Sequence, residues 1–159
     1  MYWRQDNKSW LNNKGAANKR SFKALVARNE VHGALALVGG QPVGWCCVGA
    51  YEEFPRLLGA RTLRRARPAG TWSVVCFFIR ADWRGRHVAS ALLAQAATLA
   101  FKAGAREIEG YPVVVKKGAT MPAAFAYTGT EPMFRHAGFT RVDKGGAGRA
   151  IYVKRRAEK

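Results

Sequence analysis

The stretch IRADWRGRHVASALLAQAATLAFKAGA, residues 79–105, decides the fold of this chain. A strand-like run enters it, and the charged residues Arg84 and Arg86 then precede an uncharged segment, residues 89–101. That segment predicts an apolar helix packed against a sheet, which ends at the cation Lys102 and the glycine beyond it. The first N–H groups of a helix lack partners within it and carry roughly half a positive charge. The two arginines therefore stand beside a helix start that suits a phosphate.

The segments around this helix predict a mixed sheet. TWSVVCFFIR (71–80) is β-branched and aromatic on both faces, which favours a central, fully buried strand. AREIEGYPVVV predicts a strand over 106–111, and the helix between these two strands makes them a parallel pair. Upstream, GALALVGGQPVGWCCVGAY predicts a hairpin with strands 33–38 and 43–50 joined by a turn at 39–42.

The N-terminal third adds a helix and a basic loop. The segment 21–30 has the apolar spacing of a short amphipathic helix, and Trp3 and Trp10 are expected to anchor the residues before it on the core. The segment 52–70 is basic and broken by prolines, which predicts a surface loop. That loop is either solvated or in contact with an anionic ligand or partner, and its densest basic patch is Arg61, Arg64, Arg65 and Arg67.

The C-terminal third predicts one more helix and a strand pair. Thr130 suits a helix N-cap and Gly138 a C-terminal cap, and GFTRV and RAIYVKR then form two strands around a loop at 143–148. The expected order is helix, hairpin, strand, helix, strand, helix, hairpin. This order predicts a mixed α/β fold, with a central sheet of about six or seven strands flanked by helices, in one domain over 1–159.

Composition narrows the class of protein. No apolar run reaches the roughly 18 residues that span a bilayer, and MYWRQDNKSW lacks the apolar core of a signal peptide, so we expect a soluble, cytoplasmic protein. Cys46, Cys47 and Cys76 are odd in number and form no CxxC pair, and the histidines are scattered. We therefore expect neither a disulfide framework nor a metal site. The cysteines are interpreted as small apolar strand residues, with a nucleophilic Cys76 as the alternative.

The helix start carries a recognisable pattern. Neither GxxxxGK[ST] nor GxGxxG occurs, but R-x-x-x-x-A follows a central strand and opens the long helix. This resembles the GNAT superfamily of acyl-CoA-dependent N-acyltransferases, whose signature is R/Q-x-x-G-x-G/A. Arg84 and Ala89 match its outer positions, and His87 stands where the family usually has glycine, in a loop where histidine tolerates a positive φ better than most residues.

Two further segments extend the resemblance to roughly residues 20–154. MFRHAGF (133–139) is similar to the late helix of the family, and QPVGWCCV (41–48) is similar to its hairpin. The family usually begins with a strand, for which Met1 to Trp10 is either the equivalent or a shortened form. The resemblance implies a GNAT-like sheet in which the parallel central strands 74–80 and 106–111 splay apart.

The resemblance also implies where acetyl-CoA binds. Its pantetheine arm is expected to pair with the backbone near Phe77 to Ile79, and its pyrophosphate to lie on the N–H groups of residues 84–89. A backbone N–H near Phe77 or Phe78 is expected to polarise the thioester carbonyl. The implied cofactor-binding residues are Phe77, Phe78, Ile79, Arg84, Gly85, Arg86, His87, Val88, Ala89, Ser90, Thr130 and Phe134.

Two proton transfers need agents. Glu109, on the strand that flanks the wedge, is the candidate base for the attacking amine, against the alternative of a surface carboxylate or an arginine partner. Glu107 shares its strand face and is expected to be solvated. Family members often use a tyrosine on the late helix as the acid, but Phe134 stands there, so Tyr127 is the candidate acid, with Tyr111 as a substitute. Core or capping roles for Tyr127 and Thr130 remain the alternatives.

The function implied is an N-acetyltransferase that moves an acetyl group from acetyl-CoA to a primary amine of a small molecule or protein by direct attack in a ternary complex. The net charge of +17 favours a neutral or acidic acceptor over a polycation, and homodimers are common in the family. That charge also supports an alternative, a basic protein bound to nucleic acid or ribosomes. A catalytically inactive acyl-CoA sensor is the other alternative, because Phe134 and His87 depart from the family pattern.

Overall fold

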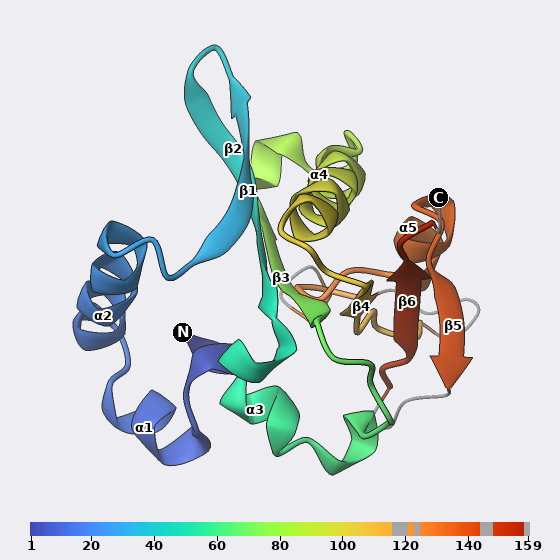
Figure 1. The fold of residues 1–159 in the computed structure, drawn as a ribbon. Helices are drawn as coiled ribbons and strands as arrows, with labels where there is room; N and C mark the ends of the chain where they lie inside the picture. Colours follow the sequence, from blue (N-terminus) through green and yellow to red (C-terminus); the bar gives the residue numbers. More distant parts are fainter. Residues whose placement is uncertain (116–120, 123–124, 144–147, 158–159) are drawn as a thin grey trace.

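The structure is a computed structural model, and it describes residues 1–115, 121–122, 125–143 and 148–157 (Figure 1). Its six strands form one sheet in the order β1-β2-β3-β4-β6-β5. Only β3 and β4 are parallel, and every other neighbouring pair is antiparallel. The expected mixed sheet is confirmed, with six strands: β1 (His32–Val38), β2 (Gln41–Ala50), β3 (Thr71–Ile79), β4 (Glu107–Gly110), β5 (Thr140–Asp143) and β6 (Ile151–Arg155).

Helices cover both faces of the sheet. The long helix α4 (Val88–Lys102) lies on one face, while α1 (Asn7–Asn12), α2 (Ala16–Ala27) and α3 (Pro55–Leu58) lie on the opposite side (Figure 1). A short helix, α5 (Glu131–His136), precedes β5. The two faces carry separate hydrophobic clusters, so β3 is packed from both sides. Residues of α4 at helical spacing are buried against the sheet, namely Leu92, Leu93, Ala96, Ala97 and Ala100.

The first ten residues form no strand, so of the two alternatives they are not the equivalent of the family's first strand. They form a 3₁₀ turn, Tyr2–Arg4, and then enter α1, where the Asp6 carboxylate accepts a hydrogen bond from the Ser9 N–H at 2.9 Å. Such a cap satisfies an N–H that a helix start otherwise leaves unpaired, which favours a helix here. The expected anchoring is confirmed for Trp3, which is buried. Residues 144–147 of the expected last loop lie outside the described residues.

The parallel pair of strands ends early. β3 pairs with β4 only over Thr71–Val74, opposite Glu107–Gly110. Beyond this point the two chains diverge, and the outer half of β3 keeps β2 as its neighbour. The expectation that the whole of β3 is buried is therefore wrong at Phe78, whose side chain is 55% exposed where β4 no longer covers the edge.

The segment before α5 bridges the divergence. The Tyr127 carbonyl oxygen accepts from the Phe77 N–H of β3 at 2.7 Å, and the Gly129 carbonyl oxygen accepts from the Val113 N–H, beyond β4, at 3.0 Å. Thr130 also forms a parallel bridge with Val113. Backbone groups that lose their sheet partners at the divergence thus find new ones in residues 127–130.

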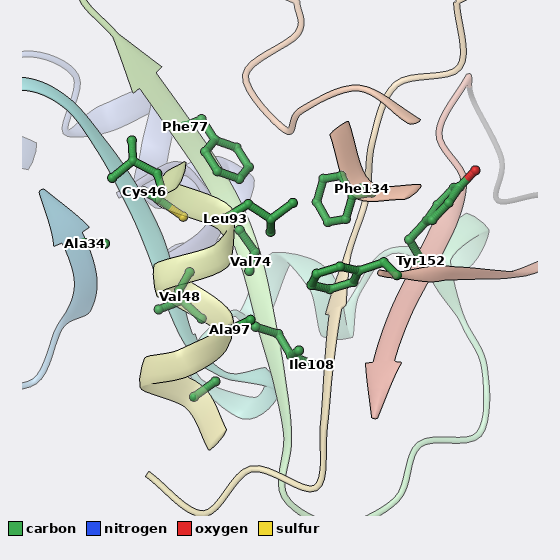
Figure 2. Packing of buried hydrophobic residues seen from close by; sticks show 14 of the residues in the cluster. Ala34, Cys46, Val48, Val74, Phe77, Leu93, Ala97, Ile108, Phe134 and Tyr152 are labelled. Atoms are coloured by element: carbon green, nitrogen blue, oxygen red, sulfur yellow. The ribbon is translucent and has the colours of Figure 1, made fainter. Parts of the chain in front are cut away.

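Phe134 of α5 fills the base of the gap. Its ring is fully buried and makes edge contacts with Phe77 and Phe139, with ring centroids 6.5 and 5.0 Å away. Figure 2 shows Phe134 between Phe77 and Tyr152. The same ring lies against the backbone of Gly110, where a Cβ atom would collide with it. A glycine at the end of β4 is therefore needed for the ring to sit between the strands.

The Gly110→Ala substitution tests this packing. We expect it to lower the free energy of unfolding by about 1–3 kcal/mol, because an added methyl group overpacks a filled core. Gly59→Ala is the matched control, since Gly59 has an ordinary φ of −80° and an added Cβ would make only ordinary contacts, with the carbonyl oxygens of Pro55 at 3.6 Å and Arg56 at 3.9 Å. Urea unfolding of both variants measures the difference, and equal midpoints would contradict the role of Phe134 as a wedge.

Candidate functional site

A large cavity of about 850 Å³ opens where β3 and β4 diverge. Its walls come from the outer half of β3, the start of α4 and the segment leading into α5. It brings together six of the expected cofactor-binding residues and the candidate acid Tyr127. The full lining is Trp45, Cys76, Phe77, Phe78, Ile79, Arg84, Ala89, Ala126, Tyr127, Gly129, Thr130 and Met133.

The start of α4 has the open geometry that the sequence implied. His87 adopts the left-handed conformation, with φ of 58° and ψ of 12°, so histidine does occupy the position that the family gives to glycine. Gly85 has φ of 72°, and a Cβ there would meet no atom within 4 Å, which leaves the backbone open to a ligand. Arg84 lines the cavity and donates from Nε to the Ile79 carbonyl oxygen at 3.2 Å.

Other predicted residues of this loop lie outside the cavity wall. The Arg86 guanidinium stands over the Trp83 ring, 5.0 Å from its centroid. The remaining ones, Gly85, His87, Val88 and Ser90, shape the first turn of α4 and are absent from the described lining. Phe134 is absent from the lining as well, because its ring belongs to the core behind the gap.

The free edge of β3 presents alternate N–H groups to the gap. The Phe77 N–H faces it and donates to the Tyr127 carbonyl oxygen. The Arg80 N–H donates to Val43 of β2 at 2.9 Å, so Phe78, two residues before Arg80, also directs its N–H towards β2. Of the two N–H groups that the sequence left open for the oxyanion role, that of Phe77 is therefore the one on the gap side, and Ile79, two residues from Phe77, also has its N–H on this side.

A second, smaller cavity of about 170 Å³ lies on the side of the N-terminal helices. It shares Trp45, Cys76 and Tyr127 with the large cavity, so the two meet at these residues. We name it the aromatic cavity; its lining is Met1, Tyr2, Trp3, Arg4, Trp10, Phe22, Trp45, Cys47, Phe54, Val75, Cys76 and Tyr127. The sequence analysis assigned Trp3 and Trp10 only an anchoring role, although three aromatic residues among the first ten are a signal of an aromatic cavity wall.

The phenol of Tyr127 and the thiol of Cys76, where the cavities meet, are held in their neutral forms. Burial raises the pKa of Tyr127, against the opposing effect of the Arg149 guanidinium, whose Nη2 donates to the phenol oxygen at 3.1 Å. Burial also raises the pKa of Cys76 to about 11. At neutral pH Tyr127 therefore holds a proton that it can donate. Cys76 is a thiol rather than the thiolate that a nucleophilic role requires.

Glu109 lies in a buried cluster of charges beside β4, and it lines neither cavity. Its carboxylate accepts from Arg65 Nε at 2.8 Å and Arg67 Nε at 2.7 Å, and also from the Tyr111 hydroxyl. The sequence left three roles open for Glu109: a base, a surface carboxylate or a partner of an arginine. Its position in the structure fits the role of an arginine partner.

Glu107 is a correction to the sequence expectation. It is 1% exposed instead of solvated, and it pairs with Arg65 and with Arg155 Nε, the latter at 3.2 Å. The basic patch of the 52–70 segment is also divided, because Arg65 turns inward to these carboxylates while Arg61 and Arg64 are exposed. Carboxylates this deeply buried need close counter-charges, which the loop supplies.

Two further features of the described residues bear on other functions. Among them, no group of three or more His, Cys, Asp or Glu side chains is placed to hold a metal ion. The helices within the described ranges are also all too short or too polar to traverse a lipid bilayer.

The Glu109→Gln substitution separates a structural role from a catalytic one. We expect a loss of about 3–5 kcal/mol in the free energy of unfolding, because Arg65 and Arg67 lose a buried counter-charge. Glu30→Gln is the control, since Glu30 pairs with Arg28 on the open surface and its loss should leave stability unchanged. Native stability of Glu109→Gln together with lower turnover would return Glu109 to the role of base.

Comparisons with known proteins agree with this geometry. The sequence model described as the acetyltransferase (GNAT) family matches residues 1–115. No curated protein matches the sequence. Among solved structures, the ribosomal-protein-alanine N-acetyltransferase from Brucella melitensis has a TM-score of 0.56 at 18% identity, over 87% of this chain and 77% of that one.

Two further structures contain coenzyme A. The PaiA N-acetyltransferase from Thermoplasma acidophilum, in complex with coenzyme A, has a TM-score of 0.56 at 14% identity, over 94% of this chain and 77% of that one. An aminoglycoside acetyltransferase in complex with coenzyme A and kanamycin has a TM-score of 0.58 at 16% identity, over 88% and 75%. At these identities the likeness concerns the fold.

Proposed function

We propose, from the premise that the chain belongs to the acetyltransferase (GNAT) family, that it transfers an acetyl group from acetyl-CoA to a primary amine in a ternary complex. The observation that carries the proposal is the large cavity at the divergence of β3 and β4. It begins at the open start of a long helix and ends at a tyrosine that retains its proton. Phosphate binding and proton donation thus stand at opposite ends of one cavity.

The residues along the cavity fit the parts of acetyl-CoA in order. Arg84 and the first N–H groups of α4 would hold the pyrophosphate, because they combine a full charge with unpaired donors. The Ile79 N–H would pair with the pantetheine arm along the free edge of β3. Acetyl-CoA supplies an activated acetyl group as a thioester, which would then lie beside Cys76 and Tyr127. The Phe77 N–H at this end already donates to the Tyr127 carbonyl oxygen. It can polarise the thioester only if the carbonyl oxygen of the thioester takes the place of the Tyr127 oxygen.

Proton transfer in this site depends on few groups. Among the described residues that line the two cavities, none is Asp or Glu, so the amine has to arrive uncharged. Turnover should then rise with pH as the neutral fraction of the amine rises. Tyr127 gives its phenolic proton to the departing thiolate, and its raised pKa keeps that proton in place through the same pH range.

Loss of the arginines tests the phosphate site. We expect Arg84→Ala combined with Arg86→Ala to weaken acetyl-CoA binding about tenfold or more, because each charge-assisted hydrogen bond contributes roughly 1.5–3 kcal/mol. Lys102→Ala, at the other end of α4, should bind acetyl-CoA as the native chain does. Titration calorimetry measures all three, and a native chain that binds no acetyl-CoA at micromolar concentrations would overturn the proposed function.

Tyr127→Phe tests the acid. We expect kcat to fall about tenfold to 100-fold with unchanged acetyl-CoA affinity; this is the low end of acid catalysis, because a thiol of pKa about 8.5 leaves readily. Release of free thiol in a stopped assay measures kcat. Native turnover by the variant would assign Tyr127 to the core alone. A native chain that binds acetyl-CoA and acetylates no amine in a broad screen would be an acyl-CoA sensor instead.

A further inference from the structure

The aromatic cavity stands where an acceptor has to stand if the proposed function holds, and the inference that follows rests on that function. The cavity meets the large one at Trp45, Cys76 and Tyr127, beside the proposed position of the thioester. The aromatic cavity lies on the face of the sheet that the N-terminal helices cover, opposite to α4 (Figure 1). A molecule in it would therefore lie beside the proposed position of the thioester, on the side away from α4.

The size and walls of the aromatic cavity define the group that fits. Seven of its twelve lining residues are aromatic, which favours an apolar group over a charged one. Its volume is about 170 Å³, and an apolar cavity of about 150 Å³ accommodates benzene. One aromatic ring or a branched aliphatic side chain fills such a space.

Two donor atoms of wall residues make no hydrogen bond to the described residues. The Arg4 side chain is only 9% exposed; its Nη2 lies 2.8 Å from a Glu53 carboxylate oxygen and its guanidinium also interacts with the Cys47 thiol and the Phe54 ring, but its Nε has no hydrogen bond. The indole Nε1 of Trp3 is also buried without a partner. Both atoms are donors, and an unpaired buried donor costs roughly 1–3 kcal/mol. Both residues line the cavity, so a ligand oxygen that gains access to these atoms through a small side-chain shift would recover that cost.

The charges that line the aromatic cavity disfavour an acceptor that carries a second cationic group. The described lining holds no carboxylate that could pair with an extra ammonium, and Arg4 itself is a cation. A polyamine or a lysine side chain would bring a charge without a counter-ion. An acceptor with one amine, one apolar group and one carbonyl or carboxylate oxygen satisfies every feature of the cavity.

We propose that the aromatic cavity is the acceptor site, and that the acceptor is an α-amino acid, or its amide, with a bulky apolar side chain of about one ring. The side chain fills the cavity, the carboxyl or amide oxygen faces Arg4 and Trp3, and the α-amine points to the meeting place of the two cavities. The amine nitrogen forms a bond to the acetyl carbon while the carbon–sulfur bond breaks. One amine proton passes to solvent, Tyr127 protonates the sulfur, and a proton from solvent then restores the Tyr127 phenol.

A panel of acceptors tests the proposal with the full chain and acetyl-CoA. L-phenylalanine or L-phenylalaninamide should exceed L-alanine, L-lysine and phenethylamine at least tenfold in kcat/KM for acetyl transfer. Alanine lacks the ring and phenethylamine lacks the oxygen, so each omits one recognised feature. Comparison of L-phenylalanine with L-phenylalaninamide shows whether the site recognises the negative charge of a carboxylate or only a carbonyl oxygen. Mass spectrometry of the products confirms which nitrogen carries the acetyl group.

Two variants assign the preference to the cavity. Phe22→Ala enlarges it and should lower kcat/KM for phenylalanine about tenfold while favouring tryptophan, as pocket volume changes do. Leu25→Ala, on the same helix but outside the lining, is the matched control and should keep the native preference. Arg4→Lys keeps the charge and loses the Nε donor, so it should reduce the advantage of phenylalanine or its amide over phenethylamine.

Calorimetry with acetyl-CoA separates the two levels of failure. Every variant should bind acetyl-CoA as the native chain does, which also reports that it is folded. If the native chain binds acetyl-CoA and acetylates alanine, lysine or phenethylamine as well as phenylalanine, the acceptor proposal is wrong and the proposed function stands. If it binds no acetyl-CoA, the proposed function itself is wrong.

Discussion

The divergence of β3 from β4 is the constraint on which the rest of the structure depends. A parallel pair that stops at Val74 leaves two strand edges with unpaired backbone groups, and buried groups of this kind are costly. Residues 127–130 supply replacement partners, and Phe134 fills the space behind them. The gap is thus held open by backbone hydrogen bonds and by a packed ring, so it exists before any ligand arrives.

The arginines serve two opposite purposes, which is why net charge describes this site poorly. Arg65 and Arg67 turn inward and neutralise Glu107 and Glu109 beside β4. Arg84 instead faces the large cavity at the start of α4, where no described carboxylate lines the wall. Because Glu107 and Glu109 offset the charges of Arg65 and Arg67, the net charge of +17 resides on other residues and does not report the charge at the cavity.

Local features of the fold could be predicted from the sequence, because they depend on neighbouring residues. The apolar spacing and C-terminal cap of α4, the Gly39–Gly40 turn between β1 and β2, and the left-handed His87 were all within reach of periodicity, turn chemistry and family pattern. The Glu109 pairing was not, since its arginine partners lie 42 and 44 residues away. No local pattern reports whether a carboxylate in a short strand faces a cavity or an inward-turned loop.

The absence of carboxylates from the described cavity walls determines how the site can work. Tyr127 and Cys76 stand where the cavities meet, and burial raises the pKa of both, so neither side chain carries a negative charge near neutral pH, while the Arg149 guanidinium beside Tyr127 is a cation. A cationic amine would have to lose its solvation there without gaining a counter-ion. Under the proposed function, the site would therefore favour the neutral amine, which is also the only reactive form. Arg84, which lines the large cavity at the start of α4, would attract the phosphates of the coenzyme, and Arg149 beside Tyr127 further disfavours a cationic amine.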